Sequence, residues 1–228
     1  MAEIMMLKNI NKIYGDKIKT QVLFDVNVGF EAQSFNSIIG ESGSGKSTLM
    51  NILGTLDTPT SGDVLINGVN STQLSTNKLA ALRNETIGFV FQFHYLLPEF
   101  TVLENVLMPY LIKHGRVSAE AKKQADKLLD IVGLTRVKKN KATEISGGQQ
   151  QRTAIARALI NNPVIVLGDE PTGNLDSVTT ETVYQLMRDI NEEFKTTFIV
   201  ITHDRRVAEK ADRIIEIKDG RIEMDIRK

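Results

Sequence analysis

Short runs of β-branched and aromatic residues set the pattern of the chain up to Phe91. Four of these runs, bounded by Gly, Asn or Ser, predict strands over residues 22–30, 35–39, 63–66 and 87–91. Two more runs, at 164–167 and 198–201, are apolar at every position. Such uninterrupted apolar strands are typical of a parallel sheet that is buried on both faces.

Helical spacing replaces this pattern in the middle of the chain. We expect a helix from an N-cap at Ser118 to about Val132, with Gly133 as its stop. A second helix is expected over about 179–194, between the two apolar strands. Asp219 and Gly220 predict the turn of a C-terminal hairpin. The whole pattern indicates an α/β core with a helical insertion at roughly 92–145.

The composition narrows the class of protein. With 228 residues, 41% of them hydrophobic, the chain can bury the core of one generous domain or of two small ones. Its 28 Lys and Arg residues balance 28 Asp and Glu residues, which argues against binding to nucleic acid or to an anionic membrane by charge alone. The lack of cysteine excludes disulfides and thiolate metal sites, and it fits a reducing compartment.

No segment of the sequence reaches the ~18 apolar residues that a membrane-spanning helix needs. The opening residues 1–8 lack the hydrophobic region of a signal peptide. We therefore expect a cytoplasmic location, and any attachment to a membrane has to go through a protein partner.

A glycine-rich loop connects the strand predicted at 35–39 to a helix. The loop reads Gly40, Glu41, Ser42, Gly43, Ser44, Gly45, Lys46, Ser47, Thr48. Glycines let successive backbone N–H groups turn toward one point, and the helix N-terminus adds about half a positive charge. A triphosphate fits this concavity, with Lys46 at its β- and γ-phosphates and the Ser47 hydroxyl on Mg²⁺. The alternative is a chance match of a Gly/Ser loop, which the strand and helix on either side disfavour.

Two carboxylates, Asp169 and Glu170, follow the apolar strand at 164–167. Ligands of an open parallel sheet bind beyond the carboxyl ends of its strands, so both side chains are expected to face the phosphate site. Asp169 is suited to Mg²⁺, which prefers hard oxygen ligands, and Glu170 is left to polarise the attacking water. The alternative is a strand that ends in two solvated acids.

A second glycine motif opens a helix near residue 146. It consists of Ser146, Gly147, Gly148 and Gln149, in which Ser146 and Gln149 have the spacing of a capping box. Two glycines in a first turn cost about 1 kcal/mol each in helix propensity, which makes sense if their N–H groups must approach an anion. One ATP hardly needs two helix N-termini from a single chain, so we expect a second subunit to use this one.

With these motifs the chain resembles the ABC ATPase family over essentially its whole length. Residues 145–149 are similar to the family signature, whose first residue is usually Leu, and residues 150–159 continue it. The resemblance implies a P-loop NTPase with a RecA-like parallel-sheet core, an N-terminal antiparallel β subdomain and a helical signature subdomain. Residues 1–91 and 160–228 would form the first two parts and residues 92–159 the third. It also implies a homodimer that holds two Mg-ATP, each between the phosphate loop of one subunit and the signature of the other.

Four further residues match family positions one by one. Tyr14 matches the aromatic that stacks on adenine, whereas a lone tyrosine is more often part of a core. Gln92 matches the Gln that meets Mg²⁺ and the attacking water, and it would otherwise be a surface amide. Asp176 matches the loop that crosses the dimer interface, with a helix N-terminal acid as the alternative. His203 matches the switch histidine at the γ-phosphate, and it would otherwise be a routine strand-end histidine.

The apolar stretch at 91–109 bears on the partner. It either packs inside the helical insertion or forms a groove for a cytoplasmic helix of an integral membrane permease subunit. Together with residues 54–62 and 171–176, this stretch resembles the branch of lipoprotein-releasing ATPases, of macrolide and peptide exporters and of the cell-division ATPase of the same shape. The resemblance implies an ATPase, peripheral on the inner face of the cell membrane, that drives export or extraction of lipoprotein, peptide or macrolide-like cargo.

Two other functions are weighed against this one. DNA-repair members of the family carry a long coiled coil and translation factors carry tandem ATPase domains, and neither fits 228 continuous residues. A mechanotransmitter that transports nothing, and regulates a cell-wall or division process through its membrane partner, would show the same motifs. The sequence alone leaves this second alternative open.

Overall fold

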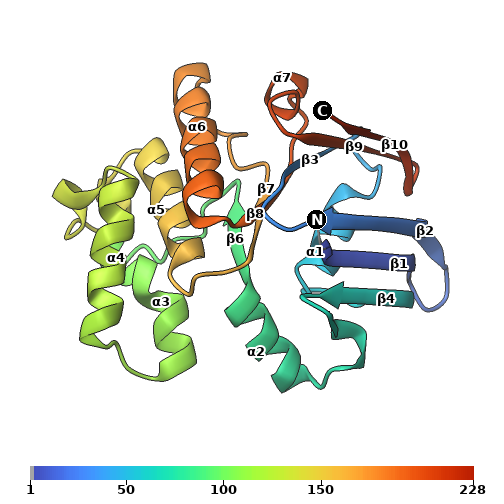
Figure 1. Ribbon diagram of the computed structural model, residues 1–228, viewed down its shortest axis with the longest axis horizontal. Helices are drawn as coiled ribbons and strands as arrows, with labels where there is room; N and C mark the ends of the chain where they lie inside the picture. The colour runs from blue at the N-terminus through green and yellow to red at the C-terminus, as the bar shows by residue number, and fades with distance from the viewer. Residues whose placement is uncertain (1–2) are drawn as a thin grey trace.

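Two β-sheets lie next to each other, with a group of helices beyond the larger one (Figure 1). The computed structural model describes residues 3–228. One sheet has the strand order β2-β1-β4-β5 and is antiparallel, and the other has the order β10-β9-β3-β8-β7-β6. This architecture confirms the predicted α/β fold class with its parallel and antiparallel parts.

The six-stranded sheet contains the apolar strands of the sequence. Its parallel strands are β3 (Phe35–Ile39), β6 (Ile87–Phe91), β7 (Ile165–Asp169), β8 (Thr197–Ile201) and β9 (Arg213–Lys218). Successive side chains point to opposite faces. In β8, Phe198 and Val200 enter one hydrophobic core, whereas Ile199 and Ile201 enter the other. Burial on both faces explains why the runs at 164–167 and 198–201, in β7 and β8, lack polar alternation.

The helix after β3, α1 (Lys46–Leu53), joins the two sheets. Its residues Leu49, Met50, Ile52 and Leu53 share one hydrophobic core with side chains of both sheets. Packing on both sides fixes the helix. The loop that precedes it is therefore held at the carboxyl end of β3.

The antiparallel sheet contains β1 (Glu3–Tyr14), β2 (Thr20–Glu31), β4 (Ser61–Ile66) and β5 (Val69–Asn70). The sequence pattern predicts β2 and β4, but it misses β1. The reason is a bulge at Asn9, where φ is 51° and the pairing with both neighbouring strands shifts. The shift puts Leu7 and Ile10, three positions apart, on the buried face. It thereby breaks the alternation by two that marks a strand.

Most of the helices gather on the side of the larger sheet that faces away from the antiparallel sheet (Figure 1). The helices after α1 are α2 (Thr76–Thr86), α3 (Val102–His114), α4 (Ala119–Ile131), α5 (Gly147–Leu159), α6 (Ser177–Phe194) and α7 (Arg205–Ala208). Helices α4 and α6 confirm the two helices predicted by spacing. The Ser118 hydroxyl accepts the N–H of Ala121 at 3.1 Å, and Gly133 has a left-handed φ of 67°. Both ends of α4 are therefore formed as predicted.

The apolar stretch at 91–109 is divided between two structures. Its second half is the start of α3, in which Val102, Val106 and Leu107 are buried in the helical core. Its first half keeps large side chains at the surface, with Phe93 at 66% exposure and Tyr95 at 63%. Internal packing and exposed apolar surface therefore both occur, in different halves of the stretch.

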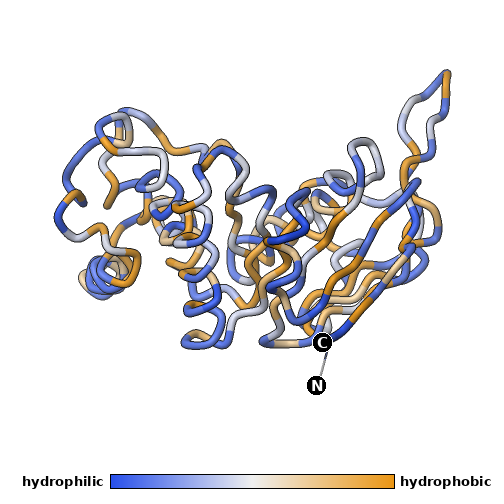
Figure 2. The backbone as a smooth tube through the Cα atoms, turned by 90° about the horizontal axis from the view of Figure 1, so that it is seen from above, coloured by the Kyte–Doolittle hydropathy of each residue, from blue (hydrophilic) through white to orange (hydrophobic). Residues whose placement is uncertain are grey.

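Hydrophobic segments are distributed in short pieces along the whole chain, as the view from above shows (Figure 2). No helix within residues 3–228 combines the length and the hydrophobicity needed to cross a bilayer.

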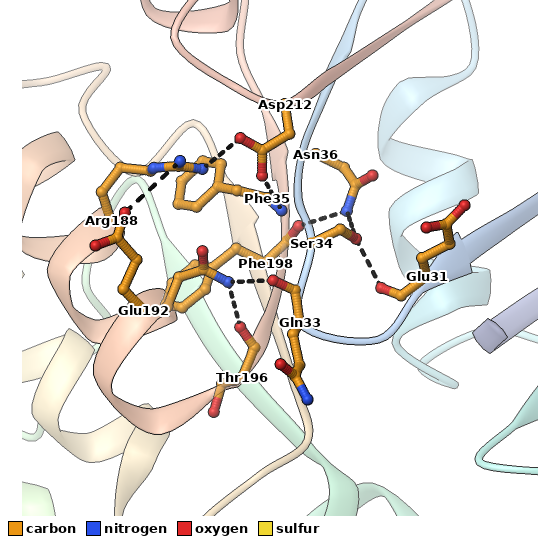
Figure 3. A network of polar contacts seen from close by, with 11 residues as sticks. Glu31, Gln33, Ser34, Phe35, Asn36, Arg188, Glu192, Thr196, Phe198 and Asp212 are labelled. Carbon is orange, nitrogen blue, oxygen red and sulfur yellow. Dashed lines mark hydrogen bonds and ion pairs between the residues drawn. The ribbon is translucent and has the colours of Figure 1, made fainter. Parts of the chain in front are cut away.

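Polar contacts tie α6 to the amino end of β3 (Figure 3). The Arg188 guanidinium donates to Asp212 Oδ1 at 2.9 Å, and it lies 5.2 Å from the centre of the Phe35 ring. The other oxygen of Asp212 accepts the N–H of Phe35 at 3.0 Å. Asn191 donates to the carbonyl of Gln33 at 3.1 Å. These bonds anchor α6 at the end of the sheet opposite the phosphate loop.

Candidate active site

The phosphate loop follows β3 and depends on three glycines. Gly40, Gly43 and Gly45 have φ values of 154°, 81° and 105°, which side chains rarely tolerate. A Cβ atom at Gly40 would lie 2.2 Å from the carbonyl oxygen of Ile217. The chain can therefore make this close turn only without a side chain, and the turn leads directly into the N-terminus of α1.

The C-terminal hairpin supports the loop. Its turn at Asp219 and Gly220 joins β9 to β10 (Arg221–Arg227), and both residues have the positive φ of a tight hairpin turn. The Gly220 N–H donates to the Ser44 carbonyl at 2.9 Å. The Gly220 carbonyl accepts the N–H of Phe24 in β2, also at 2.9 Å. The predicted hairpin therefore braces the phosphate loop against the antiparallel sheet.

A cavity of about 430 Å³ opens at this loop. It is lined by Gly40, Ser42, Gly43, Gly45, Lys46, Ser47 and Thr48, together with Val22, Glu170 and His203. The structure thus brings most of the phosphate loop to the two residues that are expected to handle the attacking water. The remaining loop residues, Glu41 and Ser44, are not part of this lining.

The loop offers donors that suit an anion. Lys46 Nζ donates to the carbonyls of Gly40 at 2.8 Å and Glu41 at 2.6 Å, which keeps the ammonium at the loop. The hydroxyl of Ser44 is buried and has no hydrogen-bond partner within residues 3–228. Buried polar groups without a partner are rare in folded proteins. Together with the N–H groups at the start of α1, these donors fit the phosphates of a nucleotide.

Four predicted residues lie at the carboxyl ends of three adjacent strands. Gln92 follows β6, Asp169 ends β7 with Glu170 next to it, and His203 lies two positions after β8. The strands are parallel, with Asp169 paired to Phe91. Strand order therefore sets these side chains side by side at the edge of the sheet where the phosphate loop begins.

Glu170 has a backbone conformation that is uncommon for its residue type. Its φ is 48°, in the left-handed region, and a non-glycine residue there costs about 1–3 kcal/mol. Its N–H donates to the carbonyl of Ile201 at 3.0 Å. Its Oε2 atom lies 2.7 Å from Nδ1 of His203. The turn after β7 therefore directs this carboxylate to the histidine that follows β8.

Asp169 is placed where a cation would stabilise its charge. Burial raises its pKa, the charge of Glu170 raises it further, and Lys46 opposes both. The hydroxyl of Ser47 and the side-chain oxygen of Gln92 are, like the Asp169 carboxylate, hard oxygen donors of the kind that Mg²⁺ prefers. No cluster of three or more His, Asp or Glu side chains forms a metal site in the described part of the chain. This donor set therefore suits a metal that takes its other ligands from phosphate and water.

Gln92 is bonded to a residue that the sequence does not single out. Its Nε2 donates to Asn174 Oδ1 at 3.1 Å, and Asn174 Nδ2 donates to the Gln92 carbonyl at 3.3 Å. The two residues are 82 positions apart, and the one local sign is that Asn174 follows a glycine. The pair joins the start of the helical insertion to the loop that leads to Asp176.

The second glycine motif forms the start of α5 with the predicted capping box. Gln149 Oε1 accepts the Ser146 N–H at 2.9 Å, and the Ser146 hydroxyl accepts the Gln149 N–H at 3.4 Å. A Cβ atom at Gly147 would meet nothing within 4 Å, whereas one at Gly148 would lie 2.8 Å from the Thr179 methyl. None of the four motif residues lines the phosphate cavity of its own chain. The space beside Gly147 at this helix start is therefore not filled by its own chain.

Tyr14 and Asp176 also lie outside the cavity lining. The Asp176 carboxylate accepts the N–H groups of Val178 and Thr179 at 3.0 Å each, and it thus caps α6. Tyr14 ends β1 with 40% of its surface exposed, so it is not a core residue. Its hydroxyl donates to Asp57 Oδ2 at 2.7 Å.

A second cavity, of about 730 Å³, lies between α2, α3 and α5. We call it the apolar groove, and its apolar lining includes Leu56, Phe89, Phe91, Tyr95, Pro109 and Ile112. Ile112 is 72% exposed. The groove therefore extends the exposed half of the 91–109 stretch onto α3, which the sequence pattern does not predict.

Arg157 of α5 holds one wall of the apolar groove. Its guanidinium donates to the carbonyls of His94 and Tyr95 at 2.6 Å each. Both residues have positive φ, at 59° and 47°. An arginine at the end of a helix gives no sequence sign of such a contact, because its partners are more than 60 positions away. The site therefore has a supporting residue that only the fold reveals.

The chain is similar to known proteins along nearly its whole length. The profile of the ABC transporter family matches residues 23–173, more than half of the chain. The lipoprotein-releasing system ATP-binding protein LolD 1 of Rhodopseudomonas palustris is 51% identical over 224 residues, which is 97% of this chain and 99% of that protein. LolD of Shewanella denitrificans is 48% identical over 220 residues, 96% of this chain and 94% of that protein.

Solved structures share the fold. A dimeric, post-hydrolysis state of the ATP-binding cassette MJ0796, bound to ADP and Pi, has a TM-score of 0.89 at 44% identity over 98% of each chain. CbiO1 from Clostridium perfringens, part of the ABC transporter complex cbiONQ, has a TM-score of 0.89 at 26% identity, over 100% of this chain and 89% of that chain.

Proposed function

The chain belongs to the ABC transporter family of ATP-binding proteins, and from this premise we propose that it powers the release of lipoproteins from a membrane. It is an ATPase subunit that binds ATP with Mg²⁺ and works as a dimer with a membrane permease. The choice of cargo rests on the lipoprotein-releasing relatives, which match about half of its residues over almost the full chain.

In the proposed site, the N–H groups of residues 40–48 and the start of α1 bind the phosphates of ATP. Lys46, which bonds to the carbonyls of Gly40 and Glu41, turns to the β- and γ-phosphates. Ser47, Asp169 and Gln92 would hold Mg²⁺, which would supply positive charge to offset that of the phosphates. Binding and charge stabilisation therefore come from the ends of three strands, β3, β6 and β7.

Glu170 is the residue that we propose to activate the attacking water. Its carboxylate accepts a hydrogen bond from that water, and such a contribution is typically 10²–10⁴ in rate. His203, 69% exposed at its side chain and bonded to Glu170, is free to turn to the γ-phosphate when ATP enters. Glu170 is then released to orient the water along the line of attack.

The start of α5 supports a site that two subunits share. Residues 146–149 are not part of the lining of the phosphate cavity of the same chain, and that cavity already has the N-terminus of α1 as its anion site. In the dimer they bind the γ-phosphate held by the partner subunit. We propose that the signature motif belongs to a helical subdomain formed by residues 92–159. We also propose that Asp176 lies on a loop at the same dimer interface.

The observation that carries the transport function is the apolar groove between α2, α3 and α5. Exposed apolar surface of this kind marks contacts with other proteins, and an amphipathic helix fits a groove lined by apolar side chains. The groove lining includes Phe91, the residue before Gln92, so its occupant is coupled to the nucleotide site. We propose that a helix of the permease binds there, which sets the chain at the inner face of the membrane.

A substitution in the groove tests this proposal. Ile112→Asp puts a charge on the exposed wall of α3, and it should abolish co-purification of the permease with the tagged chain from membranes. Ile18→Asp is the matched control, because Ile18 is equally apolar and 84% exposed but lies on the distant connection between β1 and β2. Both variants should keep the ATPase activity of the isolated chain. Equal recovery of the permease with both variants would refute the groove as its binding site.

The identity of the recovered membrane protein tests the cargo. A permease of a lipoprotein-releasing system supports the proposal. A small membrane protein that recruits a cell-wall hydrolase would instead support the regulatory mechanotransmitter, which the similarity to LolD proteins disfavours.

A further inference from the structure

Lys12 lies at a position of β1 that the bulge at Asn9 turns inward. Before the bulge Met5 and Leu7 face the core, and after it Ile10 and Lys12 do. Lys12 is only 8% exposed. Burying an ammonium group costs free energy unless the group has polar partners. The contacts of Lys12 therefore indicate its role in the structure.

The partners of Lys12 converge on Tyr14. Lys12 Nζ donates to Asp57 Oδ1 at 2.6 Å and to the Thr58 carbonyl at 2.7 Å, and it lies 4.7 Å from the centre of the Tyr14 ring. The second oxygen of Asp57 accepts the Tyr14 hydroxyl at 2.7 Å. One carboxylate thus holds both side chains. The tyrosine ring is fixed at its hydroxyl end by Asp57 and on one face by Lys12.

Asp57 in turn is attached to the helix that begins at the phosphate loop. Its N–H donates to the carbonyl of Asn51 in α1 at 3.1 Å, as does the N–H of Leu56 at 2.8 Å. Burial alone would raise the pKa of Asp57, but the hydrogen bonds from Lys12 and Tyr14 lower it below its usual value. Asp57 is therefore ionised at neutral pH, where it can accept both bonds.

We infer that Lys12 and Asp57 are positioning residues that hold the Tyr14 ring ready for the adenine of ATP. This inference rests on the stacking role that the resemblance to the ABC ATPase family implies for Tyr14. Lys12 covers one face of the ring, so a base can stack only on the other, and the 40% exposure of Tyr14 leaves surface for it. A ring that is fixed before binding loses less conformational freedom when the base arrives. Because Asp57 is bonded to α1, base and phosphates are aligned on one rigid element.

The test compares a ligand that has a base with one that has none. The dissociation constants of ADP and of pyrophosphate are measured by calorimetry for the wild-type chain, Tyr14→Phe and Lys12→Met. Tyr14→Phe keeps the stacking surface but loses the bond to Asp57, and Lys12→Met removes the ammonium from the ring. We expect ADP to bind about 5- to 10-fold more weakly to each variant, at unchanged pyrophosphate affinity. In ATPase assays, KM should rise by a similar factor while kcat stays the same.

Two controls separate the possible failures. Lys8→Met changes an exposed lysine of the same strand, and it should leave both dissociation constants unchanged. Tyr14→Ala removes the ring, and it should weaken ADP binding by about 5- to 150-fold. If Tyr14→Ala binds ADP like the wild type, the stacking role itself is wrong. If Tyr14→Ala weakens ADP binding but Tyr14→Phe and Lys12→Met do not, only the positioning role is overturned. Equal weakening of ADP and pyrophosphate would also overturn it, because the residues would then merely support the phosphate loop.

Discussion

The substitution Gly147→Ala should make the chain more stable and at the same time inactive. Gly147 is the first residue of α5, its φ is not positive, and a Cβ atom there meets nothing within 4 Å in its own chain. Alanine is therefore compatible with the folded chain. The added methyl group can therefore affect activity only if a ligand or a partner subunit occupies this open space.

The two effects have different magnitudes. Replacing a glycine in a compatible conformation by alanine stabilises a protein by about 0.4–1 kcal/mol, which raises Tm by about 1–4 °C for a chain of this size. In the proposed closed dimer the added methyl group would lie between the start of α5 and the partner's ATP. Loss of one well-placed donor to a reacting group costs about 10²–10³ in kcat, and we expect a loss of this order.

Three measurements check the prediction. Thermal unfolding gives the change in Tm, phosphate release at saturating ATP gives kcat, and ADP titration reports the phosphate loop of the same chain. Gly148→Ala is a useful contrast, because its Cβ atom would clash with the Thr179 methyl at 2.8 Å and should lower Tm. A Gly147→Ala variant with a kcat within about threefold of the wild type would refute the reasoning, since no anion could then approach this helix start closely.

Two other changes test the packing and the ion pairs. Tyr184→Phe removes a buried hydroxyl that has no hydrogen-bond partner in the described residues. The free energy of unfolding should therefore stay the same or rise by about 1 kcal/mol. A clear fall in Tm would show that the hydroxyl does have a partner. The hydrogen bonds from Arg213, at 2.6 Å each, lower the pKa of Asp225 below its usual value of about 3.9. The stability that Asp225 contributes is thus present above this value and is lost as the pH falls through the lower folded-state pKa. Between pH 6 and pH 3, the free energy of unfolding measured in urea should fall less for Asp225→Asn than for the wild type. Equal decreases for the two proteins would contradict this ion pair.

The parts of the site that could be predicted are those encoded in short continuous segments. The phosphate loop, the acids after β7 and the capping box of α5 each follow or begin an element with a strong pattern. The runs at 164–167 and 198–201 are apolar at every position, so the carboxyl ends of β7 and β8 can be located within two residues. The tight turn at Asp219 and Gly220 is likewise local.

The parts that were missed depend on long-range contacts or on breaks in a pattern. The sequence pattern misses β1 because of the bulge at Asn9: the inward-facing positions are odd-numbered before the bulge and even-numbered after it. Pro109 lies inside α3, where a proline normally argues against a helix, so the sequence pattern of the apolar stretch at 91–109 does not by itself predict α3. The bonds of Arg157 and Asn174 join segments more than 60 positions apart, and no local rule predicts them.

The central claim, a shared site that two subunits close over ATP, is tested by the size of the particle. Glu170→Gln should slow hydrolysis by about 10²–10⁴ and keep ATP bound, so that the chain runs as a dimer in ATP and as a monomer in ADP in size-exclusion chromatography with light scattering. Adding Ser146→Arg, which blocks the start of α5, should return the ATP-bound chain to a monomer with nearly unchanged ATP affinity. A Glu170→Gln chain that remains monomeric at saturating ATP, or a dimer that Ser146→Arg does not disrupt, would contradict the account.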